Sequence, residues 1–132
     1  MGSISTKKRK SSGGVVAVKD DVEPSQSSEY KDLAKTLKAI VAKVSKLDVA
    51  EPFMYPVDGR TFPDYYEMIK HPMDLSTLKD KIPSYESKEA FLADAELIES
   101  NCRKYNLPES DIIGWAAAVV ADIREQVVVI YT

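Results

Sequence analysis

The residue types that could support catalysis or bind a metal are few in this chain. It has one cysteine, Cys102, and one histidine, His71, whereas a structural zinc site uses four ligands drawn mostly from these two types. Cys102 lies on an apolar helical stripe, which favours a buried thiol over a nucleophile. His71 precedes a proline in a loop, where we expect an exposed ring. No Ser/His/Asp or Cys/His pairing can be argued, so we predict no catalytic residue, no cofactor and no metal site.

The residues that could bind a ligand without reacting with it are asparagines and tyrosines. Asn106 stands before Leu107 and a proline, and this spacing alone suits a helix-terminating residue and a ligand-binding amide equally. Asn101 is interpreted as a helix-surface or packing residue. Tyr65 and Tyr66 are both candidates for core aromatics, and Tyr66 is expected to be one.

The composition predicts one soluble-type globular domain. The chain has 132 residues, of which 44% are hydrophobic and 30% charged, ordinary values for a single domain. No apolar run approaches the ~20 residues that a membrane-spanning helix needs. The lone cysteine cannot form a disulfide within the chain, which fits a reducing compartment.

Charge is distributed unevenly along the chain. The net charge is −3, but the first residues contain four basic side chains and no acid, so the remainder carries −7. A mildly acidic body suits a basic partner, because complementary electrostatic fields accelerate encounter. The basic residues of the first segment are Lys7, Lys8, Arg9 and Lys10.

This basic cluster lies in residues 1–28, which we predict to be a disordered tail rich in Ser, Gly and Lys. The cluster has several interpretations: a nuclear localisation signal, nonspecific nucleic-acid contact, or solvated charge alone. Met1-Gly2 with Thr6 also fits an N-myristoylation pattern, and an adjacent basic patch would add a second anchoring signal. We expect a nuclear protein, with a cytoplasmic or membrane-anchored one as the alternative.

The rest of the chain, residues 29–130, is predicted to be one helical domain. Apolar residues at steps of three and four predict a first helix over about residues 29–47. Asp74 is the expected N-cap of a short helix over residues 75–82. Ser87 is the expected N-cap of a longer helix, which ends before Pro108. Ser110 or Asp111 is expected to cap the last helix. The apolar stripes of the last two helices are Phe91, Ala95, Ile98, Cys102 and Tyr105, and Ile112, Ala116, Val119, Ile123 and Val127.

Residues 48–73 form the most informative segment. Four prolines and a glycine exclude a long regular helix there, yet ten large apolar or aromatic side chains crowd the same stretch. A long irregular loop inside a compact domain is usually functional. Residues 64–70 are expected to hold a short helical turn. Short connections elsewhere favour antiparallel neighbours, so the predicted fold is a four-helix bundle with a long apolar loop between helices one and two.

Three segments of the chain resemble the bromodomain family. They are Phe-Pro-Asp-Tyr-Tyr-Glu-Met-Ile-Lys-His-Pro-Met-Asp-Leu-Ser-Thr-Leu at 62–78, Asn-Cys-Arg-Lys-Tyr-Asn at 101–106 and Pro-Val-Asp at 56–58. The resemblance covers roughly residues 29–130, with the segments in order and at the right spacing. It implies an all-α, left-handed antiparallel bundle that binds acetyl-lysine between the long loop and the loop after the third long helix. It also implies a monomeric, non-catalytic module of a larger complex in chromatin and transcription regulation.

The resemblance assigns roles to individual positions. Asn106 matches the asparagine that hydrogen-bonds the acetyl carbonyl, and Tyr65 matches the tyrosine that reaches the same oxygen through a water. Tyr105 lines the wall of the cavity. Val57, Phe53 and Phe62 match the apolar positions around the acetyl methyl. Ile112 matches the position at the mouth of the site.

The chemistry of these residues agrees with such a role. Acetylation removes the charge of lysine and leaves a neutral amide whose carbonyl is a good acceptor, and an asparagine amide offers two donors. Unmodified lysine would bring an ammonium into an apolar slot that we expect to lack a carboxylate, which costs several kcal/mol. Glu51 departs from the family, because many relatives carry tryptophan there; its carboxylate suits a basic neighbour on the ligand.

Two other classes of function remain open from the sequence. An acetyl-lysine hydrolase or transferase would need a metal cluster or a cofactor loop, and the sequence offers neither. A protein-protein adapter with a weak or vestigial acetyl-lysine site is the main alternative, and the presence of Asn106 argues against it.

Overall fold

The computed structural model describes residues 24–132 of the chain. The basic cluster and the myristoylation pattern lie outside the described residues, so the interpretations given for them stay predictions. The chain divides into two units, of which the second, residues 33–132, is compact. The second unit contains everything that bears on the candidate site.

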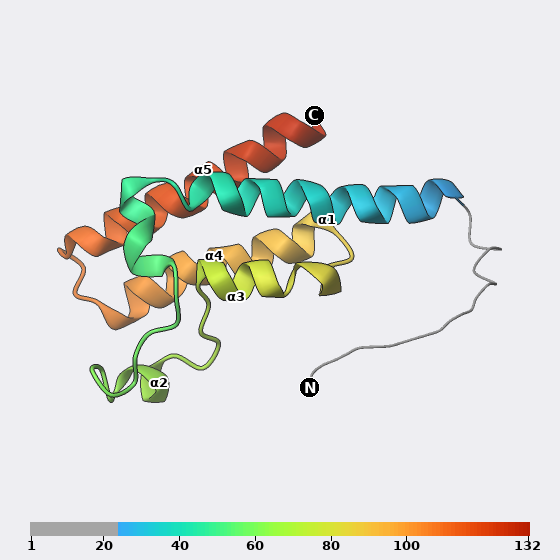
Figure 1. Ribbon diagram of the computed structural model, residues 1–132. Helices are drawn as coiled ribbons and strands as arrows, with labels where there is room; N and C mark the ends of the chain where they lie inside the picture. Colours follow the sequence, from blue (N-terminus) through green and yellow to red (C-terminus); the bar gives the residue numbers. More distant parts are fainter. Residues whose placement is uncertain (1–23) are drawn as a thin grey trace. The chain divides into compact units, whose positions relative to one another are not determined.

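Every regular element in the described part of the chain is helical, which confirms the all-α prediction (Figure 1). The α-helices of more than one turn are α1 (Pro24–Val44), α3 (Leu75–Asp80), α4 (Lys88–Tyr105) and α5 (Asp111–Tyr131). Three short elements accompany them: the 3₁₀ helix η2 (Asp48–Phe53), the single turn α2 (Tyr65–Met68) and the 3₁₀ helix η3 (Ile82–Ser84). The expected helical turn in residues 64–70 is thus confirmed as α2, whereas η2 was not predicted.

The first helix is shifted from its prediction at both ends. It begins at Pro24 rather than residue 29, and proline suits the first helical turn because that turn needs no amide donor. It ends at Val44 rather than residue 47. Tight backbone bonds from Lys46 N–H to the Lys43 carbonyl (3.1 Å) and from Leu47 N–H to the Val44 carbonyl (3.0 Å) close the last turn.

Two predicted N-caps are confirmed by their hydrogen bonds. The Asp74 carboxylate accepts from the backbone N–H of Thr77 at 2.9 Å, and the Ser87 hydroxyl accepts from the backbone N–H of Ala90 at 3.1 Å. Each bond satisfies an amide that has no partner within its own helix, a contribution of about 1 kcal/mol. Asp74 also accepts from the side-chain hydroxyls of Ser76 (2.5 Å) and Thr77 (2.6 Å).

One hydrophobic core joins the helices of the second unit. Phe91 on α4 is fully buried, as are Leu37 on α1, Leu78 on α3 and Val119 on α5. The predicted stripe of α5 is wrong at its first position, because Ile113 is buried in the core and Ile112 is only partly buried against its edge. Adjacent isoleucines both satisfy an apolar pattern, and only packing decides which one faces inward.

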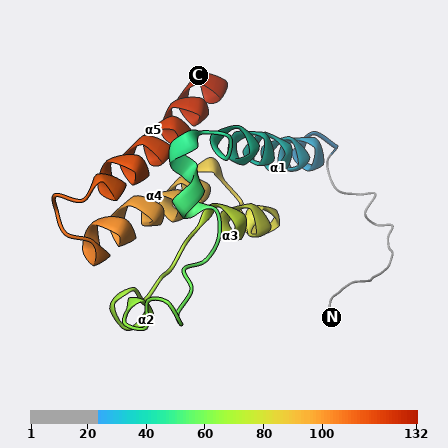
Figure 2. The same cartoon turned by 60° about the vertical axis from the view of Figure 1, so that its left-hand side comes forward.

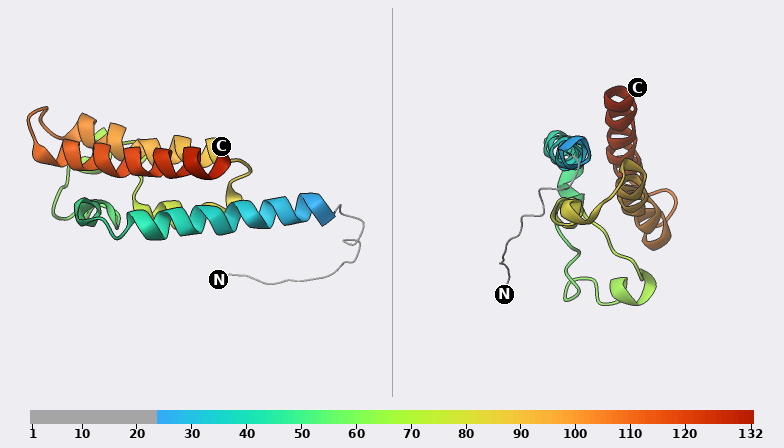
Figure 3. Two further views of the ribbon diagram at one scale, coloured as in Figure 1. Left: turned by 90° about the horizontal axis from the view of Figure 1, so that it is seen from above. Right: turned by 90° about the vertical axis from the view of Figure 1, so that its right-hand side faces the viewer.

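The helices run alongside one another, and the site lies at one end of them. A short connection makes α4 and α5 antiparallel, and the Arg124 guanidinium Nε on α5 contacts Glu96 of α4 at 3.2 Å. The long loop that contains α2 lies at the same end as the α4–α5 connection (Figure 2 and Figure 3, left). Among the described residues, no helix is long and apolar enough to cross a membrane.

Candidate functional site

A cavity of about 270 Å³ lies between the long loop, the end of α4 and the start of α5. The seven residues predicted to form the site all line it, although they come from four separate parts of the chain. Its complete lining is Pro52, Phe53, Tyr55, Val57, Phe62, Tyr65, Met73, Asp74, Ile98, Cys102, Tyr105, Asn106 and Ile112. The structure therefore brings the predicted residues together, while their contact with a ligand stays a prediction.

Asn106 provides a hydrogen-bond donor at the polar end of this cavity. It is the residue directly after α4, and its backbone N–H and its side-chain Nδ2 both donate to the Cys102 carbonyl at 3.0 Å. These two bonds fix the direction of the side chain. The second hydrogen of Nδ2 has only a weak acceptor within reach, the Cys102 sulfur at 3.6 Å, so the amide can donate to a bound carbonyl.

Burial favours the neutral form of the Cys102 thiol and of the Tyr65 hydroxyl, which line the same cavity. Burial raises the pKa of Cys102, although the hydrogen bond from Asn106 opposes that effect. Burial likewise raises the pKa of Tyr65, whose ring is 8% exposed. Among the described residues no hydrogen-bond partner is found for the Tyr65 hydroxyl, which therefore remains available as a donor to a ligand or a water.

An aromatic cluster forms one wall of the cavity. The Tyr65 and Tyr105 rings meet edge to face with centroids 4.9 Å apart, and Phe62 meets Tyr105 in the same manner at 6.4 Å. The Tyr105 hydroxyl donates to Asp64 Oδ1 at 2.7 Å, so it is already bonded and its ring serves as a wall. Phe62 is 46% exposed and therefore lies at the mouth.

Three hydrogen bonds hold the long loop against the helices. Besides the bond between Tyr105 and Asp64, Ser76 N–H donates to the Met54 carbonyl at 3.0 Å, and buried Asn101 Nδ2 donates to the His71 carbonyl at 2.8 Å. The packing role expected for Asn101 is confirmed by that bond. A loop fixed at its beginning, middle and end presents its apolar side chains in one arrangement.

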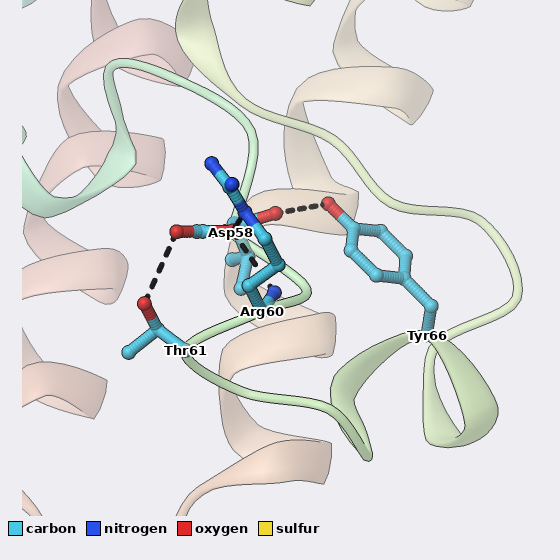
Figure 4. Close-up of polar contacts among 5 residues, drawn as sticks. Asp58, Arg60, Thr61 and Tyr66 are labelled. Atoms are coloured by element: carbon cyan, nitrogen blue, oxygen red, sulfur yellow. Dashed lines mark hydrogen bonds and ion pairs between the residues drawn. The ribbon is translucent and has the colours of Figure 1, made fainter.

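A further hydrogen bond, within the loop itself, fixes Val57, one of the predicted wall residues. The Tyr66 hydroxyl donates to the Val57 carbonyl at 2.6 Å, and the neighbouring Asp58 carboxylate accepts from the Arg60 amide (2.9 Å) and the Thr61 hydroxyl (3.1 Å) (Figure 4). The Arg60 and Thr61 hydrogen bonds lower the pKa of Asp58. The prediction of Tyr66 as a core aromatic is wrong, because its ring is 40% exposed and its hydroxyl is committed to the loop backbone.

The sequence reasoning missed several lining residues. Ile98 and Cys102 were assigned to the core stripe of α4, and they serve both the core and the cavity. Asp74 was recognised only as an N-cap. Its presence corrects the expectation of a slot without a carboxylate, but its oxygens accept three hydrogen bonds from Ser76 and Thr77. A carboxylate bonded in this way is less available to an entering ammonium.

Comparison with known proteins identifies the class to which this site and fold belong. The family model for the bromodomain matches residues 37–118. A solved structure described as the bromodomain from human BAZ1A is similar to this chain, with 28% sequence identity and a TM-score of 0.64. That match covers 69% of this chain and 87% of the other.

The chain belongs to the bromodomain family. Its fold is accordingly the left-handed four-helix bundle of that family, as predicted. Membership supports an acetyl-lysine reader role in general, and bromodomains are in general non-catalytic modules that bind acetylated peptides. Bromodomains typically occur in nuclear chromatin proteins.

Proposed function

We propose that this protein is a non-catalytic reader that binds acetyl-lysine on histone tails or other proteins, in the nucleus. The observation that supports this most is the cavity itself: apolar walls close around a single oriented amide donor, Asn106. An acetylated lysine side chain has the complementary form, a neutral apolar stem ending in a carbonyl and a methyl group.

Recognition in this proposal divides between polar and apolar contacts. The acetyl carbonyl accepts a hydrogen bond from Asn106 Nδ2, and the Tyr65 hydroxyl reaches the same oxygen through a bridging water. The methyl group and the lysine stem pack against Phe53 and Val57 of the loop and Ile112 of α5. Each hydrogen bond contributes only about 1 kcal/mol net, so most of the affinity comes from burial of the apolar stem.

Discrimination against unmodified lysine arises from the cost of desolvating its charge. An ammonium that enters an apolar cavity without an available carboxylate loses several kcal/mol of hydration. The carboxylate that lines the cavity, Asp74, already accepts three hydrogen bonds from its own helix and is therefore less available to an ammonium. The neutral acetylated side chain incurs no such cost.

The expected affinity for one acetyl-lysine is modest. Its side chain has about eight heavy atoms, and ~0.7 kcal/mol per atom gives a dissociation constant on the order of 100 µM. Tighter binding to a natural target requires contacts outside the cavity or a second binding module in the same complex.

The test is a titration of the full chain with one histone-derived peptide in acetylated and unmodified forms, followed by ¹⁵N NMR. We expect the acetylated peptide to shift the amide signals of Tyr65, Tyr105 and Asn106. Tyr65→Phe should weaken binding, whereas the matched variant Tyr131→Phe, at the far end of α5, should not. Binding that is equal for both peptide forms, or shifts confined to surfaces away from the cavity, would instead indicate an adapter.

A further inference from the structure

A second cavity, of about 310 Å³, adjoins the first. Its walls are Asp48, Val49, Glu51 and Pro52 of η2 and Trp115 of α5. Pro52 lines both cavities. A ligand bound in the first cavity therefore lies next to the second cavity. None of the roles assigned to the acetyl-lysine site uses this second space.

The geometry of η2 places two carboxylates on one face of this cavity. In a 3₁₀ helix the side chains at positions i and i+3 eclipse one another. Ala50 and Phe53 form the pair that is buried in the core, and Val49 and Pro52 form the pair at the rim. The remaining pair, Asp48 and Glu51, is exposed and directs two negative charges to the same side.

These two carboxylates have no cationic partner among the described residues. Some acidic side chains of the unit are paired, as Asp94 is with Lys81 at 2.8 Å and Glu99 with Arg103 at 2.6 Å. No such ion pair forms at Asp48 or Glu51. Both carboxylates are therefore free to attract an added cation.

An aromatic ring completes the arrangement. η2 packs against α5, the helix drawn in red in Figure 2, and Trp115 on α5 is 41% exposed beside the acidic pair. The face of an indole ring attracts cations through its quadrupole, more strongly than any other aromatic side chain. Carboxylates together with a tryptophan face suit a guanidinium or ammonium group better than any neutral group.

We propose that this second cavity binds the side chain of an arginine or lysine on the same peptide, a few residues from the acetyl-lysine. The inference rests on the proposed acetyl-lysine function of the first cavity and adds a sequence preference to it. Arginine is the favoured occupant, because its planar guanidinium can stack on the indole and bond a carboxylate at the same time. Glu51 thus gives this chain a cation-selective subsite.

The experiment uses the full chain and a set of synthetic peptides built on one acetyl-lysine with Gly and Ser flanks. Arginine is placed in turn at each of about four positions on either side, since each extended residue spans ~3.3–3.6 Å. Affinity is measured by calorimetry at low salt. Trp115 is the only tryptophan of the chain, so its fluorescence reports occupancy of the second cavity directly.

We expect arginine at one or two of these positions to tighten binding about three- to tenfold, the combined effect of one exposed ion pair and one cation–π contact. The gain should disappear in Glu51→Gln and Trp115→Leu, and should fall as salt is raised. It should persist in Glu125→Gln, which removes the same charge from an exposed position further along α5. Tryptophan fluorescence should change with the arginine peptides more than with the neutral acetylated peptide.

The outcomes separate the two proposals. Failure of the neutral acetylated peptide to bind overturns the acetyl-lysine function itself and the subsite with it. If that peptide binds but arginine adds nothing at any position, the function stands and the subsite does not. An arginine gain that is unchanged in Glu51→Gln, or equally lost in Glu125→Gln, also overturns the subsite, because it then reflects only the net negative charge of the domain.

Discussion

Replacing Asn106 by alanine removes the one oriented donor at the polar end of the cavity. The acetyl carbonyl would then be buried without its partner, which costs about 1–3 kcal/mol. That cost corresponds to a loss of affinity of about five- to 150-fold. From a starting dissociation constant on the order of 100 µM, binding would move to the millimolar range and become undetectable in most assays.

The same substitution should leave the fold intact. Asn106 follows the last residue of α4, and its backbone N–H still donates to the Cys102 carbonyl in the variant. The variant loses the side-chain bond to that carbonyl and the weak contact with the Cys102 sulfur, at a cost of about 1 kcal/mol in unfolding free energy. Calorimetric titration with an acetylated peptide, alongside thermal unfolding, separates the two effects. Unchanged affinity in Asn106→Ala would remove this residue from the site and refute the reasoning.

Three further predictions concern the cavity and the elements that support it. Tyr65→Phe should weaken acetyl-peptide binding several-fold, because the bridging water loses one partner worth about 1 kcal/mol; an unaltered calorimetric titration would contradict this. Asp74→Ala should lower the unfolding free energy by about 1–2 kcal/mol through loss of the N-cap of α3, measured as a lower urea midpoint without a changed slope. At Asp94, burial raises the pKa but hydrogen bonds from Lys81 and Tyr85 outweigh it, so the folded pKa lies below 3.8. The stabilisation is therefore complete above that value and lost as pH falls through the folded pKa. Urea midpoints of wild type and Asp94→Asn should differ at neutral pH and converge as the pH falls through the folded pKa of Asp94; a gap that does not narrow in acid would contradict this.

The parts of the fold that follow from local chemistry could be predicted from the sequence. The N-caps at Asp74 and Ser87 were identified because each precedes an apolar helical pattern, and the hydrogen bonds confirm them. The single turn α2 was anticipated in the same way. Features decided by packing could not be predicted from the sequence. The inward position of Ile113 rather than Ile112 depends on neighbours that lie far away in the sequence.

The candidate site, too, could be predicted in part, and the remainder depended on packing. Its seven predicted residues were found through motif resemblance, and periodicity alone left Asn106 undecided between two roles. Tyr65 and Tyr66 are adjacent and chemically alike, so the sequence could not tell which ring enters the core and which hydroxyl bonds the loop backbone. The approach of Trp115 to Glu51 depends on η2 packing against α5, a contact that no local pattern indicates.

The most direct test of the proposed function is a crystal structure of the full chain soaked with an acetyl-lysine peptide. We expect the acetyl carbonyl to lie within hydrogen-bond distance of Asn106 Nδ2, with the methyl group against Phe53 and Val57. A cavity left empty at saturating ligand, or an Asn106 carboxamide turned outward to solvent, would contradict it.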